Sequence, residues 1–408
     1  MRLRHRVRLA LAAGLVLTGC SALIGVNEIF LDPNASAGEG GVDEASTADR
    51  TGQDGGGADG ETCKTDLQTD PKNCGRCGHD CFGGACNAGT CAATELASIT
   101  DAPLYQVAVS AESVFVSTRI ALTTQAGGIW RIPKAGGAPQ AYVTIRYAEG
   151  LAVLGDQLYF VVDDAPANGT TAFGGLYSCP LVGASPCTPK LIAVATNARG
   201  VVIDKGTVFY GDDLAGKGLM TYAPGGAPAV FRAGFGFSAD YFVDGQQAFY
   251  TATITNNPRR AKLIEILPDA STNETYVYEN PNASDGTVRG APTFLLFTAY
   301  DDQTTTGGVV RRIPRAGGPA PCDYGANGNK RPYGVFADDK RVYWTNQGEG
   351  ADPPFTGGSL ASCELSGCCA TPDIMWTGDG QPTAVTADDT AVYFVTRGKG
   401  SLWKIAKP

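Results

Sequence analysis

Short aliphatic and aromatic runs, separated by Gly and Asp turns, fill the C-terminal three-quarters of this chain. The phrase GVFADDKRVYWTN, from Gly334, recurs as AVTADDTAVYFVT, from Ala384. Hairpin sequences with paired glycines, such as IPKAGGAP, YAPGGAP and IPRAGGPAP, lie between the copies. Apolar residues at helical spacing are hard to find beyond the N-terminus, so the pattern predicts short strands and an all-β fold.

The repeats can be aligned on the first run of each copy, which we expect to be its innermost strand. These seven runs begin near Val107, Leu151, Val201, Tyr241, Ala291, Val335 and Val385. Repeats of this length made only of short strands predict a seven-bladed β-propeller over residues 94–408. The last copy reaches Pro408 after three strands, so residues 94–100, TELASIT, are expected to complete its sheet as an N-terminal closing strand.

Residues 1–19 have the pattern of an export signal. Four arginines precede an apolar stretch from Leu9 to Leu17, which is too short to span a bilayer. The following Leu17-Thr18-Gly19-Cys20 resembles the lipobox of bacterial lipoproteins, which implies lipidation of Cys20 and anchoring to a membrane. Ser21 in place of Asp implies, by that family's sorting rule, the outer membrane or cell surface. The alternative is an ordinary secretory signal in which Cys20 has no role.

Residues 20–62 are expected to form a lipidated start followed by a disordered linker. The stretch from Leu31 to Thr62 is rich in Gly and acids and has few apolar residues, so it cannot bury enough surface to fold. The whole chain has a formal net charge of −9, and removal of the four signal arginines makes it −13. This acidic balance argues against nucleic acid as a partner and against docking on anionic lipid.

Six cysteines crowd into residues 63–93, at positions 63, 74, 77, 81, 86 and 91. An exported chain meets an oxidising compartment, so an even number of cysteines predicts a small disulfide-rich module. The sequence DPKNCGRCGHDCFGGACNAGTC, from Asp70, resembles the cysteine-rich module of the stigma-specific protein family. The resemblance rests on Asn-Cys-Gly-x-Cys-Gly at Asn73 to Gly78 and on the spaced cysteines after it. It implies an extracellular stalk or interaction role without known chemistry.

Two other readings of this cluster remain open at this point. Cys63, Cys74, Cys77, Cys81 and His79 have spacings that a zinc ion accepts, and Cys74 with Cys77 has the spacing of a redox pair. Three disulfides explain the cluster more simply, so no metal and no cofactor are predicted.

Six further cysteines lie in the repeats, at positions 179, 187, 322, 363, 368 and 369. Cys179 with Cys187 is expected to bridge one hairpin. Cys363 is expected to pair with Cys368 or Cys369, leaving the other for Cys322.

Ligand-binding residues are expected on one side of the ring, where the chain enters the inner strands and leaves the second strands; we call this the funnel face. The candidates there are Tyr105, Glu149, Arg199, Arg289 and Tyr333 before inner strands, and Asp212 and Asp301 after second strands. Equivalent positions hold Ala239, Thr383, Asp163, Asp164, Asp213, Asp302, Asn346 and Arg397. Such a polar funnel with aromatic walls suits a sugar or a peptide. Asp338-Asp339 and Asp388-Asp389 lie at the opposite face and are predicted to form turns.

Enzymatic function is not predicted, because the only histidines are His5, in the signal, and His79, in the cysteine-rich module. A propeller without histidine lacks the usual general base and the Ser-His-Asp triad. The repeats resemble the YWTD type of propeller at Tyr343 to Asn346, with Asn346 in place of Asp. Streptogramin-inactivating lyases are similar in overall build but rely on histidine.

We therefore expect a monomeric, lipid-anchored binding, adhesion or scaffold protein with a protein or glycan partner and no catalytic residues. One alternative is a carbohydrate-active enzyme, a lyase or glycosidase, that uses carboxylates such as Glu149 and tyrosines. The other is a scaffold for outer-membrane assembly.

Overall fold

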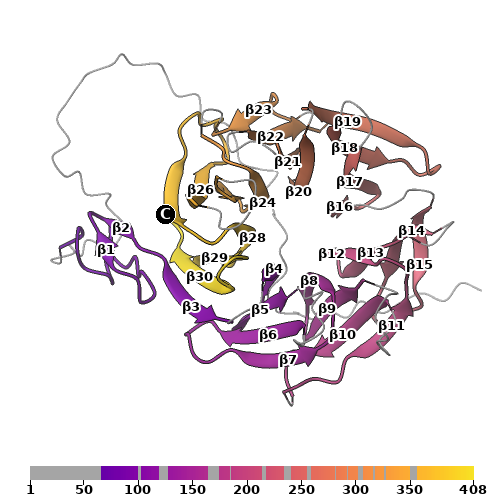
Figure 1. The fold of residues 1–408 in the computed structure, drawn as a ribbon, viewed down its shortest axis with the longest axis horizontal. Helices are drawn as coiled ribbons and strands as arrows, with labels where there is room; N and C mark the ends of the chain where they lie inside the picture. Colours follow the sequence, from indigo (N-terminus) through magenta and orange to yellow (C-terminus); the bar gives the residue numbers. More distant parts are fainter. Residues whose placement is uncertain are drawn as a thin grey trace, which may run out of the picture.

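The computed structural model contains seven four-stranded antiparallel sheets arranged around an axis (Figure 1). It describes residues 66–99, 103–118, 127–163, 174–183, 185–213, 217–233, 240–254, 259–280, 282–291, 293–301, 307–315, 318–325, 328–349 and 356–408. No helix occurs in these residues. The predicted seven-bladed, all-β propeller is confirmed.

Each blade runs from an inner strand to an outer strand. Blade 1 contains β4 (Leu104–Val109), β5 (Ser113–Thr118), β6 (Gly128–Pro133) and β7 (Gln140–Thr144); blade 2 contains β8 (Ala148–Leu154), β9 (Gln157–Val162), β10 (Gly175–Pro180) and β11 (Lys190–Val194). Blade 3 contains β12 (Arg199–Asp204), β13 (Thr207–Asp212), β14 (Gly218–Tyr222) and β15 (Ala229–Ala233); blade 4 contains β16 (Tyr241–Asp244), β17 (Gln247–Ile254), β18 (Arg260–Ile266) and β19 (Thr272–Glu279).

The remaining blades follow the same order. Blade 5 contains β20 (Ala283–Ala291), β21 (Phe294–Asp301), β22 (Gly308–Pro314) and β23 (Cys322–Tyr324); blade 6 contains β24 (Pro332–Ala337), β25 (Arg341–Asn346), β26 (Gly358–Glu364) and β27 (Asp373–Gly378). Blade 7 contains β28 (Pro382–Ala387), β29 (Ala391–Thr396), β30 (Ser401–Ala406) and, from the N-terminal side of the ring, β3 (Thr94–Ser98).

The ring is closed by pairing of strands from its two ends. β3 runs antiparallel to β30, with Ala97 opposite Leu402 and Ser98 opposite Ser401. Ala97 is buried among side chains of blades 7 and 1. The closing strand predicted from TELASIT is therefore confirmed. β3 is the fourth strand of the last blade, whereas every other blade takes its fourth strand from its own repeat.

The core consists of apolar layers between neighbouring blades. Every residue of β5 and of β29 is buried. Val107 and Val116 of blade 1 pack in one cluster with Tyr393 and Val395 of blade 7. Because complete burial of such a side chain contributes about 1.5 to 3 kcal/mol, these aliphatic and aromatic runs account for the stability of the ring.

Threonine hydroxyls add hydrogen bonds between successive blades. Thr298 Oγ1 donates to the carbonyl oxygen of Tyr333 at 2.5 Å, and Thr345 Oγ1 donates to that of Thr383 at 2.8 Å. Thr383 Oγ1 in turn donates to the carbonyl oxygen of Leu104 at 3.3 Å. Blades 5, 6, 7 and 1 are thus linked in sequence close to the inner strands.

The inner strand of blade 5 differs from the predicted register. Ala291 was expected to begin this strand, but it is the last residue of β20. Val288 lies opposite Phe297, as Val335 lies opposite Trp344 in blade 6. The prediction failed because β20 has a single β-branched core residue among polar residues and glycines. The start of the inner strand was therefore placed at the more apolar residues further along the chain.

The acidic pairs on the opposite face form turns, as predicted. Asp388 Oδ1 accepts hydrogen bonds from the backbone N–H groups of Thr390 and Ala391, at 2.9 and 2.8 Å. Asp338 makes the equivalent bonds in blade 6. These carboxylates replace water at backbone groups that the tight turn leaves without a strand partner.

Disulfides join residues within blades and between them. Cys179 pairs with Cys187, as predicted, and the alternatives at the vicinal pair resolve into Cys363–Cys369 and Cys322–Cys368. The last of these connects β23 of blade 5 to the loop before β27 of blade 6. In the cysteine-rich module, Cys74 pairs with Cys86 and Cys81 with Cys91. Of the other cysteines, Cys77 belongs to the described residues, whereas Cys20 and Cys63 lie outside them.

The module, with its hairpin of β1 (Cys86–Asn87) and β2 (Thr90–Cys91), lies beside blade 7 at the rim of the ring (Figure 1). Ala406 of β30 packs in one buried cluster with the module's disulfides. His79 Nε2 lies 2.8 Å from the carbonyl oxygen of Lys407, and Lys404 Nζ lies 4.2 Å from the ring centroid of Phe82. These contacts attach the module to the last strand of the propeller.

Candidate functional site

A recurring β-bulge shapes the inner strands at the funnel face. In β4, β8, β12, β24 and β28 the register shifts next to the first or second residue of the strand. Tyr105, Tyr333 and Thr383 are unpaired at these shifts, whereas in β8 and β12 the unpaired residues are Gly150 and Gly200, directly after Glu149 and Arg199. A bulge leaves a residue outside the ladder and turns its side chain, which is why bulges are frequent beside binding sites. Four of the five ring candidates predicted before inner strands therefore occupy equivalent positions.

The turns that lead into these bulges have unusual backbone conformations. Tyr147, Asn197, Arg331 and Gln381 have φ between 44° and 58°, the left-handed region that residues other than glycine rarely adopt. Each lies two residues before one of the positions Glu149, Arg199, Tyr333 and Thr383. Backbone strain of this kind, repeated at one end of four blades, indicates loops held in a defined shape on the funnel face.

Glu149, Asp163 and Arg199 form an ion-pair network between blades 2 and 3. Arg199 Nη2 lies 2.8 Å from Asp163 Oδ2, and Arg199 Nη1 pairs with Glu149 Oε2. The three side chains are only 9 to 13% exposed. One guanidinium thus holds two carboxylates, an arrangement suited to joining blades. Glu149 was also the carboxylate considered for glycosidase chemistry, and here it is an ion-pair partner.

Tyr105 and Arg397 form a more accessible pair where blades 1 and 7 meet. The Arg397 guanidinium lies 4.9 Å from the ring centroid of the half-buried Tyr105. Arg397 itself is exposed, as is Lys399 in the same loop. An aromatic face with a cation above it can bind sugars, carboxylates or peptide groups.

A second aromatic cluster lies between blades 5 and 6. The rings of Tyr300 and Tyr333 are 6.0 Å apart at a tilted angle, and the Arg331 guanidinium lies 5.5 Å from the ring of Tyr300. Tyr333 was a predicted site residue, but Tyr300 and Arg331 were missed. Arg331 lies directly before Pro332, and a residue before proline is often part of a turn or an extended segment. This sequence feature could have indicated that Arg331 lies at the loop before the inner strand.

Asp212 and Asp301 are buried at the ends of their strands. The Asp212 side chain pairs with Lys217 at 2.8 Å and accepts a hydrogen bond from the N–H of Thr196 at 3.0 Å. Burial, together with the Asp212 charge, raises the pKa of Tyr210 to about 12. Asp301 is 4% exposed. Both carboxylates therefore lie beneath the surface of the funnel face.

Arg289 does not occupy the predicted position before an inner strand. Because of the register of blade 5, it lies inside β20, and Gly286 takes the position equivalent to Tyr333. Arg289 Nη1 pairs with Asp240 Oδ2 of blade 4 at 2.5 Å. Burial raises the pKa of Asp240, while the charge of Arg289 opposes that rise. Ala239, Asp164 and Asp302 lie outside the described residues.

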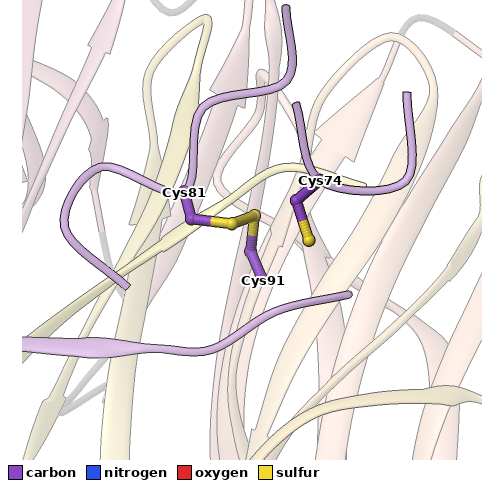
Figure 2. Close-up of side chains that lie close together, drawn as sticks. All are labelled: Cys74, Cys81 and Cys91. Atoms are coloured by element: carbon purple, nitrogen blue, oxygen red, sulfur yellow. A yellow bond between two sulfur atoms is a disulfide. The ribbon is translucent and has the colours of Figure 1, made fainter. Parts of the chain in front are cut away.

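The sulfur atoms of the cysteine-rich module are arranged as disulfides. Figure 2 shows Cys81 joined to Cys91, with Cys74 beside them; the three sulfur atoms lie within 4.8 Å of one another. Cys74 is bonded to Cys86, so the proposed Cys74–Cys77 redox pair is not formed. Disulfide sulfurs are not the thiolates that zinc requires. His79 is also occupied, because its Nδ1 lies 2.5 Å from the carbonyl oxygen of Cys74.

No helix in the described part of the chain is both long and apolar enough to cross a membrane. No protein-family model matches the sequence, and no curated protein matches it.

Solved structures resemble the propeller in fold. A catalytically inactive His-to-Ala variant of virginiamycin B lyase from Staphylococcus aureus, solved with quinupristin, has 12% identity and a TM-score of 0.55 over 78% of this chain and 99% of its own. A GH74 enzyme from Niastella koreensis has 12% identity and a TM-score of 0.54, over 76% of this chain and 53% of its own. The propeller domain of the Trilobed protease from Pyrococcus furiosus has 11% identity and a TM-score of 0.50, over 74% of this chain and 95% of its own. At these identities the similarity concerns the fold alone.

Proposed function

We propose that this chain is an extracytoplasmic, lipid-anchored binding protein whose propeller takes a protein or glycan partner on the funnel face. The observation that carries the proposal is the set of bulged inner strands, which place Tyr105 and Tyr333 at equivalent positions of the ring. Arg397 adds an exposed cationic group beside Tyr105, and Lys399 is exposed in the same loop. Aromatic and arginine side chains on a rigid scaffold are the usual centres of binding energy in interfaces.

Binding is favoured over catalysis by the chemistry of the side chains. The sequence of the propeller contains no histidine. The carboxylates of Glu149 and Asp163 are partners of Arg199. Virginiamycin B lyase shares the fold, and its His-to-Ala variant is inactive, so its catalytic group has no counterpart among these residues. We therefore expect binding without turnover.

The funnel face can be tested in the full-length protein by replacing Tyr105 and Arg397 with alanine. The first screen uses a glycan array together with photo-crosslinking from position 399, on the funnel face. Ligands found in this way should lose at least about tenfold in affinity for the Y105A/R397A variant, because hot-spot residues carry most of the binding energy.

The matched control replaces Lys340 and Asp389, two exposed turn residues on the opposite face. K340A/D389A should bind as the wild type does, and a crosslinker at position 340 should capture nothing. Equal crosslinking from both faces, or unchanged affinity of Y105A/R397A, would reject the funnel face as the site. Conversion of a captured glycan to products would favour the enzyme alternative.

A further inference from the structure

An open groove of about 330 Å³ lies between the cysteine-rich module and the outer strand of blade 6. One wall is formed by the module hairpin and the segment after it, and the other by β27. The lining residues are Asn87, Thr90, Cys91, Ala92, Ala93, Ile374, Met375, Trp376 and Thr377. This volume is at the lower end of the range, about 300 to 1,000 Å³, that is usual for small-ligand pockets.

The groove exists because the module is docked on the propeller. Phe82 lies under Lys404 of β30, and the His79 ring contacts the carbonyl oxygen of Lys407. β2 leads within three residues into β3, the closing strand of blade 7. The two walls are therefore held by covalent continuity and by the contacts at the rim, and the site is separate from the funnel face.

Trp376 forms a fixed aromatic surface in this groove. Its ring packs against Phe394, with centroids 5.1 Å apart, and against Trp403, with centroids 5.5 Å apart. Trp376 is partly buried, and the neighbouring Ile374 is 51% exposed. Because these contacts hold the ring in place, a ligand that stacks on it loses little free energy in ordering the side chain.

Two short polar side chains of the module accompany the tryptophan. Asn87 and Thr90 are exposed, and within the described residues neither side chain bonds to another part of the protein. An amide and a hydroxyl both donate and accept hydrogen bonds. The lining contains no ionisable side chain, so it offers nothing to balance a charge on a ligand.

We infer that this groove is a binding site for a neutral sugar unit of a glycan. A pyranose ring has an apolar C–H face that matches Trp376 and hydroxyl groups that match Asn87 and Thr90. The absence of charge in the lining favours a neutral hexose over a uronate or a sulfated sugar. The module then has a function of its own, as the wall that completes the site.

The test uses the full-length protein and a panel of neutral cello-, malto-, chito- and manno-oligosaccharides of two to four units. Binding is followed by calorimetry and by tryptophan fluorescence. At least one neutral oligosaccharide should bind, and N87A/T90A should weaken it about tenfold, since two hydrogen bonds are lost. W376A should remove binding altogether.

A matched control carries the same two residue types on another outer strand. T272A/N273A, on exposed positions of β19, should leave the affinity unchanged. If W376A fails to fold, the N87A/T90A variant still decides the question, because both residues lie on the surface of the module. The funnel-face variant Y105A/R397A should retain this binding.

Three results would overturn the inference. The first is that no neutral oligosaccharide binds the wild type. The second is that N87A/T90A binds as tightly as T272A/N273A. The third is that acidic oligosaccharides, or extended peptides that pair with the free edge of β27, bind in place of neutral ones and are lost in W376A.

Discussion

At the residue scale, the carboxylate of Asp388 has more partners than a turn requires. Besides the turn bonds of Oδ1, its Oδ2 lies 2.7 Å from Lys134 Nζ and accepts a hydrogen bond from the Tyr393 hydroxyl at 2.9 Å. Burial by itself would raise the pKa of Asp388, but Lys134 and the turn N–H groups outweigh it and hold the pKa well below its usual value. Because Lys134 follows β6, this turn also joins blade 7 to blade 1.

Replacement of Asp388 by Asn should lower the free energy of unfolding by about 2 kcal/mol at pH 7, because Lys134 loses its partner in a partly buried place. A depressed native pKa means that the contribution is complete above the unfolded pKa, about 3.9, begins to fall below it, and is lost as the pH falls through the lower native pKa. The difference between wild type and variant should therefore shrink below about pH 4. Urea denaturation at pH 7 and pH 3 measures both effects.

The neighbouring Asp389 provides the control, since it is exposed. D389N should match the wild type within about 0.5 kcal/mol at both pH values. If D388N is no less stable than D389N at pH 7, the link between blades 7 and 1 does not contribute. The turn role of Asp388 could be read from its spacing, but Lys134, far away in the sequence, could not.

At the scale of elements, β3 decides whether the ring closes. Ala97 is 8% exposed and packs with Leu402 and Val395 of blade 7 and with Val107 of blade 1. A carboxylate at this position would be buried without a partner, which costs several kcal/mol. A97E should therefore release β3 and lower the melting temperature in calorimetry by several degrees.

Ser98, the next residue of β3, is exposed and provides a matched test of the same strand. S98E should melt close to the wild type, because its side chain points away from the core. Equal melting of A97E and wild type would mean that β3 adds nothing to the stability of blade 7. Such closure was predictable, because the last repeat lacks a strand and TELASIT has strand-like alternation.

The elements that resisted prediction lack a local signal. In blade 5, Val288 is the single β-branched core residue of β20, and the apolar run that starts near Ala291 was wrongly taken as the inner strand. The predicted position of Arg289 was wrong for the same reason. Tyr105, Glu149, Arg199 and Tyr333 were placed correctly because their repeats keep an aliphatic run directly after the bulge.

At the scale of the whole molecule, the proposed lipid anchor decides where the propeller acts. Cys20 lies outside the described residues. In a bacterial host, C20S should lose incorporation of labelled palmitate and leave the membrane fraction, because no acyl chains remain to hold it. Fractionation of cells that express the full-length chain measures both outcomes.

A second variant separates anchoring from sorting. S21D should keep the palmitate label but move the protein from the outer to the inner membrane, following the lipoprotein sorting rule. Persistent labelling of C20S would reject the lipobox and leave an ordinary secretory signal. An unchanged location of S21D would reject only the outer-membrane assignment.

The sequence by itself determined the all-β class, the seven repeats, the closing strand and the Cys179–Cys187 disulfide. Alternation of side chains, turn residues and cysteine spacing are local properties, so they can be read without coordinates. Only the tertiary structure decided the register of β20, the network of Glu149, Asp163 and Arg199, and the docking of the module that forms the groove at Trp376. Each of these depends on side chains distant in the sequence, whose meeting is decided by how whole blades pack.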